Sequence, residues 1–123
     1  MPVRSLRSPV LKWPDAPTVD RAVRHWAQRI AQQWPKVRRV GYFGSYARGD
    51  WGVGSDVDLI VIVDGAAAPF ERRAAQLGPT QLPVPADVLV YTVDEWEALG
   101  QSGRFAPTVE REAVWIIGVG PKA

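Results

Sequence analysis

The chain has 123 residues, with 15 Lys and Arg against 13 Asp and Glu, and it contains no cysteine. This length suits one domain that folds without a covalent or metal staple, and the lack of cysteine excludes disulfides and thiolate metal sites. No long apolar run follows the basic residues near the start, so we expect neither a signal peptide nor a membrane span, and therefore a cytoplasmic protein.

The charges are unevenly distributed along the chain. Residues 1–48 hold ten Lys and Arg and two Asp and Glu, whereas residues 49–123 hold five and eleven. Such asymmetry is typical of a basic arm for nucleic acid or of an acidic partner. It also fits a solvated helix face combined with an acidic metal site, which we favour over a nucleic-acid partner. A homo-oligomer is left open.

Four prolines punctuate residues 1–17. Because each proline fixes φ and removes a backbone donor, we expect an extended tail there, held on the surface by Val10, Leu11 and Trp13. Residues 18–123 then form a single domain.

The first predicted helix follows this tail. Apolar residues recur at helical spacing from Val19 to Trp34, with Thr18 as the expected cap and Pro35 as the stop. His25, the only histidine, falls on the polar side of this helix. Without a second histidine or a cysteine to complete a metal site, we interpret it as a solvated residue.

The rest of the chain alternates between strand and helix patterns. Strands are predicted at 37–43, 57–63, 87–91 and 113–117, and helices at 66–78, 93–99 and 107–112. This order predicts an α/β fold, with a mixed sheet of about four strands and helices packed on it. The helix between the second and third strands is a crossover, which makes those two strands parallel.

Three segments should therefore meet at one end of the sheet. Parallel strands begin at the same end, so Asp56 and Asp58 at the second strand lie near Asp87 at the third. The first strand runs into Gly44-Ser45, and the chain returns twelve residues after Gly44, at Asp56. The glycine bend is therefore expected beside the three carboxylates.

These residue types point to a nucleotide and metal site. Asp56 and Asp58 are two residues apart on one strand and so point to the same face. Three carboxylates in one place repel each other unless a cation is present, and hard oxygen ligands favour Mg²⁺ or Mn²⁺ together with substrate phosphates. Two such ions about 4 Å apart can support an in-line displacement at phosphorus.

The residues of the bend fit an anionic ligand. Gly44 lets the backbone approach a phosphate closely, Ser45 begins a helical turn and adds a hydroxyl, and Arg48 lies one turn further on. Trp51, in the loop that follows, could stack on a base. We favour the simpler interpretation, in which Trp51 packs back onto its own helix.

Together, Gly44–Gly49 (GSYARG) and Ser55–Leu59 (SDVDL) closely resemble the signature of the minimal nucleotidyltransferases, within the DNA polymerase β-like superfamily. The resemblance covers roughly residues 18–117. It implies transfer of a nucleoside monophosphate from an NTP, here ATP, to a hydroxyl group, with pyrophosphate leaving. One departure is the loop Trp51–Gly54, which is less polar than in relatives.

By analogy, the resemblance also implies roles for single residues. Gly44 and Ser45 would bind the triphosphate, and Arg48 would act on the phosphate side. Asp56 and Asp58 would bind two Mg²⁺ or Mn²⁺ ions, and Asp87 would share a metal and help to deprotonate the acceptor.

The acceptor is the open question. Stand-alone minimal domains of this kind resemble antitoxins that place AMP on a tyrosine of an all-helical HEPN ribonuclease toxin, and this is our leading hypothesis. One alternative is a non-catalytic module that neutralises its partner by occlusion. Another is a small-molecule or RNA nucleotidyltransferase completed by a separate helical subunit. A P-loop ATPase is a poor fit, because no GxxxxGK[ST] motif occurs.

Overall fold

The computed structural model describes residues 13–118. In chain order these form α1 (Ala16–Gln33), β1 (Val37–Phe43), α2 (Ser45–Arg48), β2 (Val57–Val63), α3 (Phe70–Gln76), β3 (Ala86–Thr92), α4 (Val93–Gln101), α5 (Phe105–Glu112) and β4 (Val114–Ile117). The four strands make one mixed sheet in the order β3-β2-β1-β4. The predicted α/β fold is confirmed.

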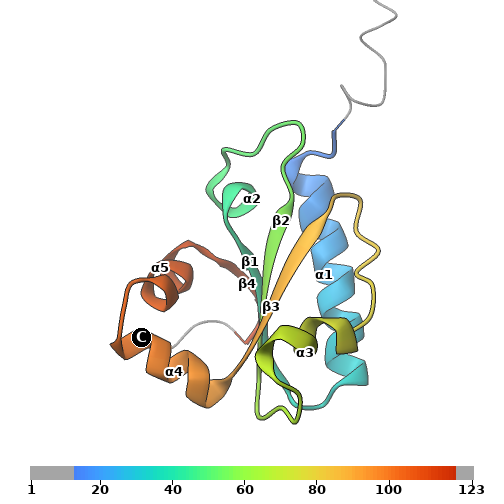
Figure 1. Cartoon of the computed structure of the whole chain (residues 1–123). Coiled ribbons are helices and arrows are strands. Elements are labelled where there is room, and N and C mark those ends of the chain that lie inside the picture. The colour runs from blue at the N-terminus through green and yellow to red at the C-terminus, as the bar shows by residue number, and fades with distance from the viewer. Residues whose placement is uncertain (1–12, 119–123) are drawn as a thin grey trace, which may run out of the picture.

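The strand directions bring the end of β1 and the starts of β2 and β3 to the same end of the sheet. β2 and β3 are parallel, as predicted, and β1 is antiparallel to both β2 and β4. Phe43 at the end of β1 therefore pairs with Asp58 near the start of β2, and Asp58 pairs with Asp87 near the start of β3. Figure 1 shows α2 and the loop after it at this end of the sheet, at the top of the view.

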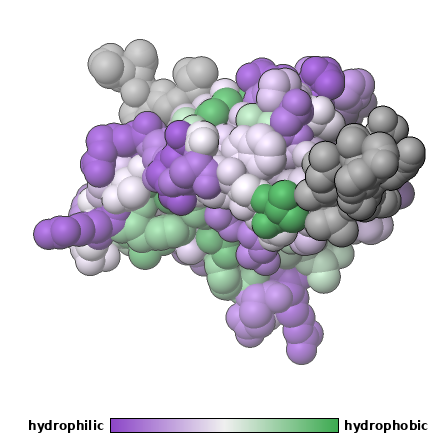
Figure 2. Space-filling model, turned by 90° about the horizontal axis from the view of Figure 1, so that it is seen from above, coloured by the Kyte–Doolittle hydropathy of each residue, from purple (hydrophilic) through white to green (hydrophobic). Residues whose placement is uncertain are grey.

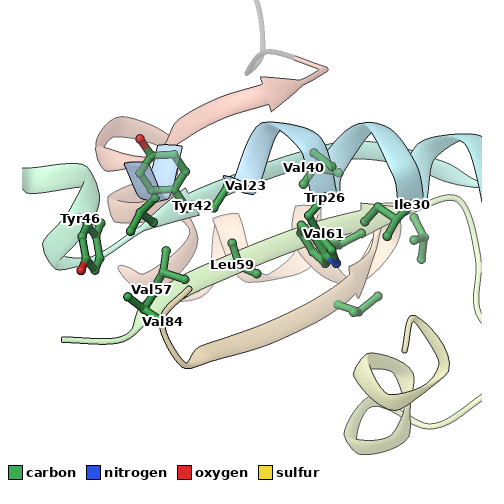
Figure 3. Packing of buried hydrophobic residues seen from close by; sticks show 14 residues of the cluster. Val23, Trp26, Ile30, Val40, Tyr42, Tyr46, Val57, Leu59, Val61 and Val84 are labelled. Carbon is green, nitrogen blue, oxygen red and sulfur yellow. The ribbon is translucent and has the colours of Figure 1, made fainter. Parts of the chain in front are cut away.

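The alternation of side chains along β2 explains how both faces of the sheet are covered. Leu59 and Val61 point to one face, where they join the buried residues of α1, among them Trp26 (Figure 3). Ile60 and Ile62 point to the opposite face, against α4 and α5. Because both faces are buried, β2 is apolar almost throughout, as expected for the centre of a covered sheet.

Helix α1 begins earlier than predicted. Its cap is Asp15, whose Oδ1 accepts a hydrogen bond from the Thr18 amide at 3.0 Å, and Pro17 lies in the first turn. The prediction of Thr18 as the cap was therefore wrong. A proline is tolerated in the first turn because the amide it lacks has no partner within the helix.

Helix α3 is shorter than the predicted 66–78. It begins at Phe70, with Pro69 as its cap at ψ 157°. The residue before a proline is disfavoured in the helical region, so Ala68 stays outside. Smaller differences occur elsewhere: β3 is longer by one residue at each end, α4 continues through Gly100 to Gln101, and α5 starts two residues earlier than predicted.

The expected extended tail falls mostly outside the described residues, including Val10 and Leu11. Trp13 is described, and its indole Nε1 donates to the Tyr46 hydroxyl at 3.0 Å. Within residues 13–118, no helix has both the length and the apolar character needed to cross a membrane.

An ion pair with a buried arginine and a partly exposed glutamate ties α3 to the start of α4. The Arg73 side chain is 8% exposed and donates to both carboxylate oxygens of Glu95, at 2.6 and 3.0 Å. Glu95 also accepts from the Thr92 amide, and the Thr92 side chain accepts from the Glu95 amide, so the two residues form a capping box. The Arg73 hydrogen bonds, with help from the Thr92 amide, lower the pKa of Glu95 to about 2.

We expect Glu95→Gln to destabilise the fold by about 1 kcal/mol at pH 7, measured by urea unfolding. The full pKa shift of Glu95 would correspond to a larger loss of stability. We expect less because the Glu95 side chain is 42% exposed and solvent screens its interaction with Arg73. The depressed pKa stabilises the fold above about pH 4.5, and this contribution is lost as pH falls towards about 2. The two proteins should therefore become equally stable near pH 2, with Glu97→Gln as an exposed control. A difference that persists at pH 2 would contradict this account.

Candidate active site

Three carboxylates converge where β2 and β3 begin. Asp56, Asp58 and Asp87 each offer an oxygen within 4.8 Å of those of the other two. The pairing of Asp58 with Asp87 across the parallel strands causes this approach. The hydrogen bond from the Val57 amide to the Pro85 carbonyl, at 2.9 Å, holds the two strand starts together. The structure thus brings together the three acidic residues that the sequence singled out.

The electrostatics of this cluster fit a divalent cation. Asp58 is partly buried, and desolvation, followed by the charges of Asp56 and Asp87, raises its pKa. Arg48 acts in the opposite direction but does not cancel these effects. A cluster of oxygen-only ligands with excess negative charge is the donor set that Mg²⁺ and Mn²⁺ prefer. The three carboxylates therefore fit the metal expected from the sequence.

Gly44 is required at the bend beside this cluster. It has φ 83° and ψ −153°, a region that is essentially restricted to glycine. A Cβ at this position would also collide with Oδ2 of Asp58. The bend and the carboxylate therefore share a space that only a glycine leaves open.

The short helix after the bend is anchored by Tyr46, which is 4% exposed. The Tyr46 hydroxyl donates to the Pro14 carbonyl at 3.0 Å. On its other side, the Tyr46 ring stacks on Trp51, with 5.3 Å between ring centroids. The interpretation of Trp51 as a residue that packs back onto its own helix is confirmed. Ser45 is the first residue of this helix and is half-buried.

Glu112, the last residue of α5, is a member of the site that the sequence did not indicate. Its Oε2 accepts from the Gly44 amide at 2.7 Å and from Arg48 Nη1 at 3.3 Å. Arg48 also pairs with the exposed Asp50 at 3.1 Å. The only available signal was an acidic residue before the last predicted strand, and its meaning depends on how that strand pairs with β1.

A cavity of about 370 Å³ opens beside two of the carboxylates, Asp58 and Asp87. Its other walls are apolar, formed by Phe43, Val88, Leu89 and Phe105. Phe105 is 41% exposed, and its ring meets that of Phe43 edge to face at 6.0 Å. Seen from above in Figure 2, this end of the molecule carries hydrophilic side chains around smaller hydrophobic areas.

The close approach of Gly44 to Asp58 can be tested with Gly44→Ala. The new methyl group should displace the Asp58 carboxylate and weaken Mn²⁺ binding by about tenfold or more, since residues that orient metal ligands typically have effects of this size. Gly49→Ala is the matched control, because Gly49 also has positive φ, 92°, but open space around it. Each variant should lose about 1–3 kcal/mol of stability, and only Gly44→Ala should lose Mn²⁺ affinity in calorimetric titration. Equal Mn²⁺ affinities would refute the coupling.

Comparison with known proteins agrees with this arrangement. The model of the nucleotidyltransferase domain family matches residues 23–115. A Sulfolobus solfataricus protein, provisionally classed as a nucleotidyltransferase, has a similar structure, with a TM-score of 0.61, 19% identity and coverage of 81% of this chain and 80% of that one. A toxin–antitoxin structure with AMP-PNP gives a TM-score of 0.52 at 16% identity, covering 79% and 74%. No curated protein matches. Because the family match runs through all three strands that shape the carboxylate cluster, this chain belongs to the nucleotidyltransferase domain family.

Proposed function

We propose that this protein transfers AMP from ATP to a hydroxyl group, using two divalent metal ions, and that it does so in the cytoplasm. The observation that carries the proposal is the convergence of Asp56, Asp58 and Asp87 beside the Gly44 bend. Membership of the nucleotidyltransferase domain family supports the reaction class. In the reaction, the acceptor oxygen bonds to the α-phosphorus of ATP, the bond to the β-phosphate oxygen breaks, and pyrophosphate leaves with its electron pair.

Each site residue then has a role. Asp56 and Asp58 hold the metals, Mg²⁺ or Mn²⁺, and Asp87 shares in this and takes the proton of the acceptor hydroxyl. The ions supply charge stabilisation for the attacking and leaving oxygens. Gly44, Ser45 and Arg48 orient the triphosphate, so that the α-phosphorus faces the acceptor.

We further propose that the acceptor is a tyrosine of a helical HEPN-type toxin, with this protein as its antitoxin. The similar toxin–antitoxin structure with AMP-PNP supports a protein partner and a nucleotide. The apolar cavity next to Asp58 and Asp87 supports an acceptor whose hydroxyl is carried on an apolar, flat group. A polyhydroxylated sugar would find few hydrogen-bond partners on Phe43, Leu89 and Phe105, and burying it there would be unfavourable.

The first test is co-expression with whatever helical protein is encoded next to this one. With wild type, ATP and Mg²⁺, we expect the mass of the partner to rise by one adenylyl group per modified site. The double variant Asp56→Ala/Asp58→Ala should transfer at least about a thousandfold more slowly, because the ions contribute several kcal/mol to the transition state. Glu71→Gln, which changes an exposed carboxylate on α3 outside the cluster, is the control.

The same experiment separates the alternatives. A partner mass that is equally unchanged with wild type and the double variant would reject protein adenylylation. If the double variant still protects cells, neutralisation occurs by occlusion. Labelled RNA or a labelled small molecule in place of labelled partner would identify the other acceptor class.

A second prediction concerns the cavity wall. Phe105→Ala should lower kcat/KM for the partner by about tenfold, the loss expected when an aromatic contact is removed, while the Kd of ATP stays within about twofold. Phe70→Ala is a matched control, since Phe70 is 39% exposed against 41% for Phe105 and does not line the cavity. Wild-type kcat/KM in Phe105→Ala would show that the acceptor does not use this wall.

A further inference from the structure

We propose that Glu112 is a positioning residue for the nucleotide, which holds the Gly44 amide and the Arg48 guanidinium in the arrangement that receives the phosphates. This inference rests on the proposed function, because it assumes that Gly44 and Arg48 face a triphosphate. Glu112 itself need not touch the nucleotide. It acts through the two groups to which it is hydrogen-bonded.

The register of the sheet explains why this carboxylate meets Gly44. β1 and β4 are antiparallel, and Tyr42 pairs with Val114. When this antiparallel register is continued by two residues, forward from Tyr42 and backward from Val114, Gly44 falls opposite Glu112. There the backbone of Glu112 already belongs to α5, so its side chain supplies the acceptor that a strand carbonyl would have supplied. Glu112 thus extends the hydrogen bonding of the sheet by one step and joins the bend to it.

The strength of these contacts also favours a positioning role. The 2.7 Å bond from the Gly44 amide to a carboxylate is short and charge-assisted. The Glu112 side chain is 19% exposed, whereas Asp50, the other partner of Arg48, is 63% exposed. An exposed ion pair restrains a side chain weakly. Arg48 contacts both carboxylates, Asp50 at 3.1 Å and Glu112 at 3.3 Å. Only the less exposed Glu112 also accepts a hydrogen bond from the Gly44 amide, so that it links Arg48 to the bend.

The opposite role, an internal anion that competes with the phosphate, fits the geometry less well. β1 lies between β2 and β4 in the sheet. Asp58 approaches Gly44 from β2, and Glu112 approaches it from the end of α5, next to β4. The two carboxylates therefore contact the bend from different neighbours, and the contact made by Glu112 does not use the side of Gly44 that faces Asp58.

The test compares the Kd of ATP, with Mg²⁺, for wild type, Glu112→Ala, Glu112→Gln and the control Glu71→Gln, by calorimetric titration. Glu112→Ala should raise the Kd by about tenfold, the usual effect of losing a hydrogen bond to a charged group. Glu112→Gln retains an oxygen for the Gly44 amide but no charge for Arg48, so its Kd should lie between those of wild type and Glu112→Ala. Glu71→Gln removes the same charge elsewhere and should bind like wild type.

The direction of the change in the Kd of ATP decides whether Glu112 positions the nucleotide or competes with its phosphates. If Glu112→Ala and Glu112→Gln bind ATP as tightly as wild type, or more tightly, Glu112 does not position the nucleotide and the proposal is overturned. A matching loss of thermal stability in Glu112→Ala and Glu112→Gln, without the graded change in Kd, would also overturn it, because it would make the residue merely structural.

A second readout does not depend on the nucleotide. The Gly44 amide proton, bonded to a carboxylate, should resonate at low field in a ¹⁵N-resolved NMR spectrum and move to higher field in Glu112→Ala. If wild type binds no ATP but the Gly44 resonance moves as expected, the proposed function fails and the contact stands. If the resonance does not move, the positioning role fails whatever the Kd.

Discussion

The mutual repulsion of three carboxylates is the constraint on which the rest of this structure depends. Asp56, Asp58 and Asp87 cannot relax apart, because the register of β2 with β3 fixes their backbones and the buried faces of β2 fix the register. A slip of one residue would turn every apolar side chain of β2 to the wrong face. The hydrophobic core therefore holds the acidic cluster together, and the charge is left for a cation to neutralise.

The bend at Gly44 shows how closely the neighbouring segment is fitted to this cluster. Asp58 occupies the space where a side chain at position 44 would lie, and Glu112 accepts a hydrogen bond from the Gly44 amide. Tyr46, the second residue of α2, is buried, and its hydroxyl donates to the Pro14 carbonyl. Three contacts thus restrain the bend and the start of α2, which preorganises this segment for the triphosphate that we propose it binds.

The boundaries of β1 and β2 could be predicted to the residue, because both are apolar runs between clear breaks, and the convergence of the acidic residues followed from the crossover rule. The starts of α1 and α3 could not, since Pro17 lies inside one helix and Pro69 caps the other. Glu112 and Phe105 were also missed as site residues. Their positions depend on how β4 pairs with β1 and where α5 packs, and neither leaves a local pattern in the sequence.

Helix α5 connects the two sides of the site. Phe105 is its first residue and lines the cavity, whereas Glu112 is its last and holds the Gly44 bend. Between them, Glu110 accepts two hydrogen bonds from Arg39, at 2.7 and 2.8 Å, and one from the Trp96 indole at 2.7 Å, which fixes the helix against β1 and α4. A helix of eight residues is about 12 Å long. The cavity wall and the bend are therefore held at a constant separation, so that a group seated against Phe105 has a defined position relative to one bound at Gly44.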